Sequence, residues 1–130
     1  MRFIYDDGGR SKYFTAQAGD CVTRAVAIAT GLDYKEVYDN IKRLIKHTPR
    51  NGVSKKETRA IMEAYGFTWV SCMTIGAGCT THLREDELPK GVIMCQLTKH
   101  VTTVKDGVIY DTYDPSRGGS RCVYGYWYKK

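Results

Sequence analysis

The chain has 130 residues, of which 42% are apolar and 26% are charged, and its formal net charge is +6. These values are typical of a folded globular chain and exclude wholesale disorder, and the length suits a single domain over residues 1–130. The positive charge permits acidic partners, nucleic acid included, but does not by itself indicate one.

The N-terminal residues lack the apolar stretch and the small-residue cleavage site of a signal peptide, and no segment is long and apolar enough for a membrane span. No lipidation motif is visible. We therefore expect a cytoplasmic protein without a membrane partner. The five cysteines are odd in number and irregularly spaced, so in a reducing cytoplasm we expect most of them to be free thiols.

The first part of the chain begins with a polar, turn-rich segment. Residues 1–19 are predicted to form a short strand or extended arm and then a loop. A helix is predicted to begin at Asp20, a good N-cap, and to end at Gly31. Apolar residues cover most of its circumference, so it should be buried on several sides.

Two further helices are predicted directly after the first. The second follows Asp33, with Glu36 at the capping-box position, and the third follows Ser54, with Glu57 at that position. Gly66 is expected to end the third helix.

The second half of the chain is rich in strand-forming residues. Asp106-Gly107 is a strong signal for a two-residue hairpin turn. A short helical turn is expected over 83–89, and loops over 73–82 and 115–121. Helices followed by an antiparallel sheet predict an α+β fold. The predicted strands are 67–72, 91–97, 100–105, 108–113 and 122–128.

Cys21 is the first residue with a candidate chemical role. It lies near the first position of a predicted helix, where unpaired N–H groups and the helix dipole favour a thiolate. Gly19 lets the backbone turn sharply there, and the Cys21 N–H could donate a hydrogen bond to an oxyanion. The alternative is that Cys21 is a small, half-buried core residue.

His100 is the second candidate, because the hairpin brings a carboxylate to it. If Asp106-Gly107 forms a two-residue turn, Asp111 is the diagonal same-face neighbour of His100. If the loop has three residues, Asp114 joins that face instead. We favour Asp111, since Asp-Gly is a preferred two-residue turn. A single histidine is otherwise usually structural, and Asp114-Pro115 could simply begin a turn.

These residues together supply the parts of a nucleophilic site. A thiol needs a base to ionise it at neutral pH, and the base needs an acceptor that fixes its tautomer. The chain order of Cys21, His100 and Asp111 provides all three.

The segments GDCVTRAVAIATG (19–31) and KHVTTVKDGVIYDTYDP (99–115) resemble the papain-like cysteine hydrolases. The resemblance implies a nucleophile at the start of a central helix, packed on a C-terminal antiparallel sheet that carries the histidine and the acid. The pattern is similar to small peptidases of bacteria and their phages, and Asp20-Cys21 and Asp114-Pro115 are reminiscent of the bacteriocin-processing peptidases.

The same resemblance implies an oxyanion-hole glutamine before the cysteine. Gln17 is the candidate, four residues upstream of Cys21, which is closer than these families usually have it. Its small neighbours Ala18 and Gly19 could let it reach. The alternatives are another donor, or the Cys21 N–H alone.

Two weaker signals point elsewhere. Cys72, Cys79 and His82 could begin a zinc site, but a second ligand pair is missing, so we expect no metal and no cofactor. The C-terminal segment 121–130 alternates aromatic and basic residues and could stack on single-stranded nucleic acid. A sheet strand with alternating faces explains the same pattern.

We therefore expect a small cysteine hydrolase that acts on a peptide or isopeptide bond of a peptide or protein substrate through an acyl-enzyme. Cys21 would be the nucleophile, His100 the base and Asp111, or else Asp114, its orienting acid. The loops 73–82 and 115–121 are the expected walls of the substrate pocket. A papain-like binding module for a host protein or nucleic acid, and a transglutaminase-type acyl transfer, are the alternatives.

Overall fold

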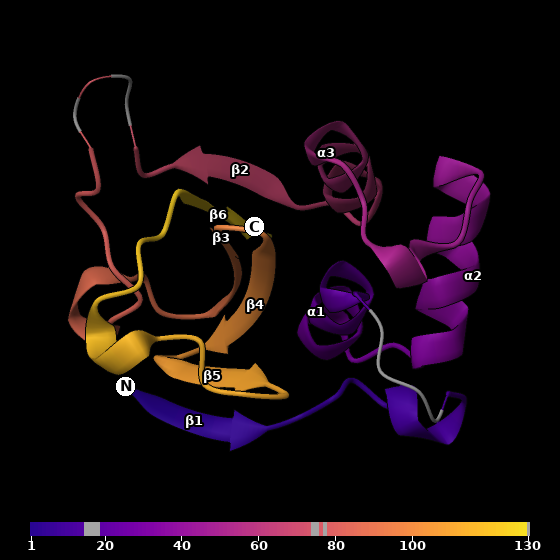
Figure 1. The fold of residues 1–130 in the computed structure, drawn as a ribbon, viewed down its shortest axis with the longest axis horizontal. Coiled ribbons are helices and arrows are strands. Elements are labelled where there is room, and N and C mark those ends of the chain that lie inside the picture. Colours follow the sequence, from indigo (N-terminus) through magenta and orange to yellow (C-terminus); the bar gives the residue numbers. More distant parts are fainter. Residues whose placement is uncertain (15–18, 74–75, 77, 130) are drawn as a thin grey trace.

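A computed structural model describes residues 1–14, 19–73, 76 and 78–129. In these residues the chain forms three α-helices and one six-stranded sheet, an α+β arrangement (Figure 1). The helices are α1 (Cys21–Thr30), α2 (Tyr34–Ile45) and α3 (Lys55–Ala64), and the strands are β1 (Arg2–Tyr5), β2 (Thr68–Ser71), β3 (Val92–Leu97), β4 (His100–Lys105), β5 (Val108–Asp111) and β6 (Gly125–Tyr128).

The helix boundaries follow the local signals in the sequence, although neither Asp20 nor Asp33 caps its helix with its side chain. Helix α1 ends at Gly31, whose φ of 74° is the left-handed conformation that glycine adopts without a steric penalty. Helix α3 has the predicted capping box between Ser54 and Glu57. The box predicted for α2 is wrong, because the Asp33 carboxylate caps no N–H and instead accepts a hydrogen bond of 2.7 Å from the Tyr13 hydroxyl.

The sheet is mixed and not purely antiparallel. Its strand order is β1-β5-β4-β3-β6-β2, and every pairing is antiparallel except that of β1 with β5. The extended arm predicted at the N-terminus is this edge strand, with Arg2 opposite Val108 and Tyr5 opposite Asp111. The expectation of a wholly C-terminal antiparallel sheet is therefore wrong at one edge, because pairing across so many residues leaves no local signal in the sequence.

The hairpin between β4 and β5 has the predicted register. Lys105 pairs with Val108, and the two turn residues Asp106 and Gly107 both have positive φ, at 48° and 79°. Two successive positive φ values match the turn whose twist suits a two-residue hairpin. Strand β5 ends at Asp111, two residues earlier than predicted, so Asp111 is the last residue of the strand.

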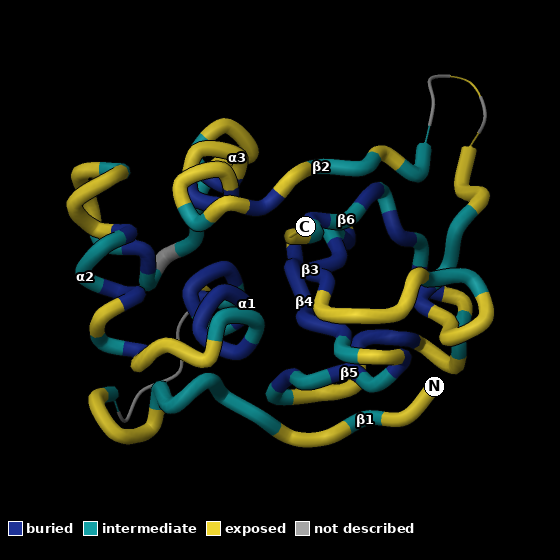
Figure 2. Tube along the Cα trace, turned by 180° about the vertical axis from the view of Figure 1, so that it is seen from behind, coloured by how far each residue is buried: buried dark blue, intermediate teal, exposed yellow. Residues whose placement is uncertain are grey.

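Helix α1 lies between the sheet and α2, with α3 above it in the view, and the sheet curves away from α1 (Figure 1). One apolar cluster fills the space between α1 and the sheet and includes Val26 and Trp127. A second cluster covers the other face of the sheet and includes Leu83, Val104 and Val123. Figure 2 shows α1, β3 and β4 buried, whereas the outer sides of α2 and α3 are exposed.

The aromatic C-terminal segment is an interior strand. Strand β6 lies between β3 and β2, with Trp127 in the first cluster and Tyr126 and Tyr128 packed against the second. This alternation agrees with the interpretation of the segment as a sheet strand.

The cysteines divide into two groups. Cys21, Cys72 and Cys95 are free, as expected for most of the thiols, but Cys79 and Cys122 form a disulfide that the sequence analysis did not predict. The two partners are 43 residues apart, so only the folded chain shows that they meet. None of the helices in the described part of the chain is long and apolar enough to cross a lipid bilayer.

Candidate active site

Cys21 is the first residue of α1 and is half-buried. The first N–H groups of a helix have no partner within the helix, so positive partial charge gathers at this end. The exposed Gly19 precedes it. The local setting predicted for Cys21, a thiol at a helix start with a small residue before it, is therefore present.

Helix α1 and strand β4 run side by side, and one turn of the helix advances about as far as two residues of the strand. The backbone of Val101 lies close enough to the Cys21 thiol to lower its pKa, and the Thr103 hydroxyl donates a buried hydrogen bond of 2.8 Å to the Ala25 carbonyl. Four residues advance a helix by about 6 Å, and two residues advance a strand by about 6.7 Å, so these two pairs align over one turn. The start of α1 is thereby held against the start of β4, where His100 lies.

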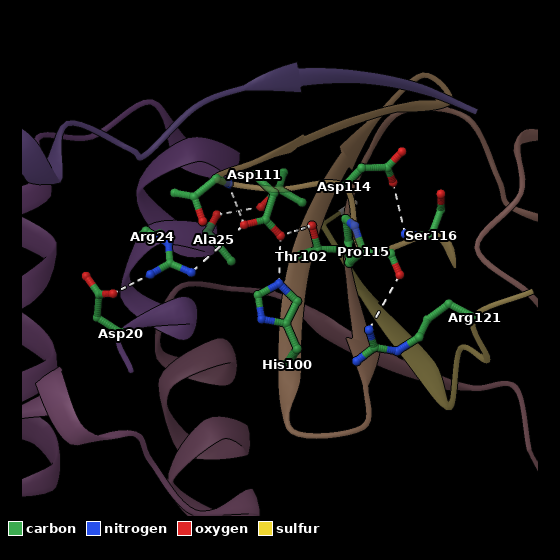
Figure 3. A network of polar contacts seen from close by, with 12 residues as sticks. Asp20, Arg24, Ala25, His100, Thr102, Asp111, Asp114, Pro115, Ser116 and Arg121 are labelled. Atoms are coloured by element: carbon green, nitrogen blue, oxygen red, sulfur yellow. Dashed lines mark hydrogen bonds and ion pairs between the residues drawn. The ribbon is translucent and has the colours of Figure 1, made fainter. Parts of the chain in front are cut away.

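His100 and Asp111 form the predicted pair. Nε2 of His100 is 2.6 Å from Oδ2 of Asp111, and both side chains are buried. The same oxygen accepts a 2.6 Å hydrogen bond from the Thr102 hydroxyl, and Oδ1 accepts one of 2.7 Å from the Thr112 N–H. Three donors thus hold the carboxylate in place, and the ring nitrogen left for the thiol is Nδ1 (Figure 3).

Asp114 does not take part in this contact. It is exposed and accepts a 2.9 Å hydrogen bond from the Ser116 N–H, and it lies apart from His100 in Figure 3. Asp114 therefore begins a turn, and the two-residue hairpin loop selects Asp111.

The pKa values of the three groups shift so that each group favours its charged form. Burial raises the pKa of Cys21, but the hydrogen bond and charge of His100, the Val101 N–H and the Arg24 charge outweigh it, so the pKa is lowered. Burial lowers the pKa of His100, but hydrogen bonds to Asp111 and Cys21 and their charges raise it to about 9. The pKa of Asp111 is lowered, because His100 and Thr102 outweigh the opposing effect of burial. These directions favour a thiolate beside an imidazolium.

Asp20 stabilises the start of α1 in a way that the sequence did not predict. Although it is the N-cap residue, its side chain makes no capping bond. The carboxylate is almost fully buried and binds Arg24, the Tyr34 hydroxyl and Arg10, the last at 3.0 Å. The contact between Asp20 and Arg24 could have been predicted, because residues four apart at a helix start lie on the same face.

Arg24 connects this network to the candidate triad. Its Nη2 lies 3.9 Å from Oδ1 of Asp111, while Nη1 binds Asp20. Figure 3 shows the guanidinium between the two carboxylates. Arg24 therefore balances the charge of Asp111 while contributing positive potential at Cys21.

The turn that precedes His100 is supported from the C-terminal part of the chain. Leu97 pairs with His100, so Thr98 and Lys99 form the turn between β3 and β4. Nη2 of the buried Arg121 donates a 2.9 Å hydrogen bond to the Thr98 carbonyl. The loop 115–121 is thus partly buried and supports this turn, contrary to the expectation that it forms a wall of the substrate pocket.

A cleft of about 930 Å³ opens at Cys21 and His100. In the described residues its walls include Trp69, the turn between β3 and β4, Tyr113, Tyr124 and Trp127, together with six residues before and within α3: Pro49, Gly52, Val53, Lys55, Thr58 and Arg59. No described residue of 73–82 lines it, and residues 74, 75 and 77 of that predicted wall lie outside the described residues. Pocket walls come from segments that only the folded chain brings together.

Two further sequence predictions concern the rest of the site. Gln17, the candidate oxyanion donor, lies outside the described residues. Among the described residues no group of three or more His, Cys, Asp or Glu side chains could hold a metal ion. The local pair considered for zinc is used otherwise, since Cys79 is in the disulfide and Nδ1 of His82 is 3.1 Å from Glu87.

Comparison of the chain with models of protein families, with curated proteins and with solved structures gives no match.

Proposed function

We propose that this protein is a cysteine hydrolase of papain-like fold that cleaves a peptide or isopeptide bond. The observation that carries the proposal is the buried His100–Asp111 pair, whose imidazole lines the same cleft as Cys21. Cys21 is a thiol at a helix start, and Cys21 and His100 each shift the pKa of the other. The three residues lie beside a cleft large enough for a chain segment.

The chemistry follows from the protonation states that the site favours. The Cys21 thiolate attacks the substrate carbonyl carbon, and the N–H of Cys21 donates to the oxygen that becomes negative. The His100 imidazolium then gives its proton to the leaving amine, and a thioester to Cys21 remains. Next, neutral His100 takes a proton from water, the hydroxide attacks the thioester, and the acid product leaves with the thiolate restored.

Asp111 serves the reaction by holding His100. Its hydrogen bond to Nε2 fixes the tautomer that points Nδ1 at the thiol, and its charge stabilises the imidazolium. Gln17 is the proposed second donor to the oxyanion, by resemblance to the papain-like enzymes.

The decisive experiment is labelling with a thiol-directed acyl probe, followed by mass spectrometry. We expect rapid labelling of Cys21 and its loss in Cys21→Ala and His100→Ala. Cys72→Ala is the matched control, because burial raises the pKa of Cys72 and its removal should leave labelling intact. Equal labelling of the Cys21→Ala protein would overturn the proposal, and a function that survives Cys21→Ser would support a binding module instead.

A further inference from the structure

The cleft beside Cys21 carries positive charge without a matching negative group. Lys55 and Arg59 of α3 and Lys99 of the turn between β3 and β4 all line it, and all three are exposed. Among the described residues, no Asp or Glu lines the cleft. In that same part of the chain, no carboxylate lies within 4.0 Å of these three cations. Only the fold brings Lys55 and Arg59 to the site, because the walls of the cleft come from segments that are far apart in the chain.

Trp69 and Trp127 line the cleft and form an aromatic floor beneath Arg59. The rings of Trp69 and Trp127 lie 4.8 Å apart, and the guanidinium of Arg59 lies 5.5 Å above the Trp127 ring. Trp127 is 4% exposed, and its Nε1 has no hydrogen-bond partner among the described residues. An apolar floor removes water from one side of a bound group, which strengthens the attraction between that group and the neighbouring cations. The stacked guanidinium is also held in a defined position.

Resting on the proposed hydrolase function, we propose that the cleft selects peptides that carry carboxylate side chains on the residues flanking the scissile bond. Lys55 and Arg59 bind a carboxylate at one part of the cleft, and Lys99, next to His100, binds one near the reacting bond. A peptide fits better than a nucleic acid, because the thiol and imidazole in the same cleft require a carbonyl to attack.

The substrate preference can be measured with three pools of internally quenched peptides. The pools are identical except that the positions flanking the scissile bond carry Glu, Gln or Lys. We expect kcat/KM to fall in that order, and the advantage of Glu over Gln to shrink as salt is added. Cleavage of the Lys pool as fast as the Glu pool would overturn the proposal while leaving the hydrolase function intact.

Substitutions assign the preference to the named cations. Arg59→Gln and Lys55→Gln should each lower the ratio of kcat/KM for Glu over Gln peptides by about three-fold, the size expected for a partly exposed ion pair. Lys56→Gln is the matched control, since Lys56 is the exposed neighbour on α3 that does not line the cleft. An equal loss in all three variants would mean that net charge, and not the cleft, sets the preference.

Binding separates this proposal from catalysis. In the Cys21→Ala protein, the quenching of tryptophan fluorescence should report tighter binding of the Glu peptides than of the Gln peptides. The same preference could be found while the unchanged protein cleaves no peptide. In that last case the hydrolase function fails and the acidic preference stands. Tighter binding of a single-stranded oligonucleotide than of the Glu peptides would overturn the acidic-peptide proposal in favour of nucleic acid.

Discussion

Nε2 of His100 lies 2.6 Å from Oδ2 of Asp111, across a hairpin whose two-residue turn decides which carboxylate faces the ring. The pairing of Lys105 with Val108 places Asp111 on the same face as His100 and Thr102. A register shift of one residue would have turned Asp111 to the opposite face. The identity of the orienting acid is therefore a consequence of the Asp106-Gly107 turn.

The role of Asp111 can be tested against its neighbour Asp114. In Asp111→Ala, His100 loses its acceptor, and we expect kcat/KM to fall roughly 100-fold or more, the range expected when positioned acid–base catalysis is lost. Asp114→Ala is the matched control and should retain near-normal activity, because its carboxylate binds only the Ser116 N–H among the described residues. Equal losses in the two variants would contradict the assignment.

Activity should depend on pH through the two reacting groups. The rate should rise as the thiolate forms, at a pH below the ordinary pKa of 9.0 for a cysteine, because the pKa of Cys21 is lowered. It should fall as pH rises through about 9, where His100 loses its proton. Asp111→Asn keeps an acceptor but removes the charge, so the upper limb of the kcat/KM profile should move to lower pH. An unmoved upper limb would show that Asp111 does not stabilise the imidazolium.

The raised pKa of His100 also makes stability depend on pH. A group whose pKa is higher in the folded state contributes stability that is fully present below its unfolded pKa and is lost as pH rises through the folded value. For His100 this window runs from 6.5 to about 9. The contribution of His100 to the free energy of urea unfolding should therefore fall across this window, and it should be absent from His100→Gln.

Asp20 should be essential for the start of α1. Asp20→Ala leaves Arg10 and Arg24 without their buried partner, and we expect unfolding to become easier by about 3–5 kcal/mol, as for other broken buried pairs. Asp39→Ala is the control, since Asp39 pairs with Lys35 on the exposed side of α2 and should cost less than about 1 kcal/mol. Urea unfolding followed by circular dichroism measures both, and similar costs would contradict the role of the buried network.

The disulfide between Cys79 and Cys122 gives a direct chemical test of the fold. The unfolded oxidised chain should titrate three thiols and the reduced chain five. Reduction should lower the free energy of unfolding by about 2–4 kcal/mol, the usual contribution of a native disulfide. Labelling of Cys21 in the native state should persist, because neither cysteine of the disulfide lines the cleft. A count of five thiols before reduction would contradict the disulfide. The protein should be kept under oxidising conditions for this measurement, because such bonds persist only there.

Several parts of the fold could be predicted because their signals are local. The end of α1 at Gly31, the capping box at Ser54 and the hairpin at Asp106-Gly107 each depend on residues close together in the chain, where capping and turn preferences act directly. The proximity of His100 and Asp111 also followed, since a two-residue turn and the alternation of a strand determine the faces of both residues.

Only the tertiary structure shows which distant segments contact these elements. The pairing of β1 with β5, the contacts of Asp20 with Arg10 and Tyr34, and the support of Thr98 by Arg121 all join segments far apart in the chain. Such contacts depend on how the whole core packs, and many alternatives agree equally well with the local pattern. The sequence by itself therefore predicted the candidate thiol and base and favoured Asp111 over Asp114 as the acid, whereas the tertiary packing decided between the two acids, their support and the charge of the cleft in which they lie.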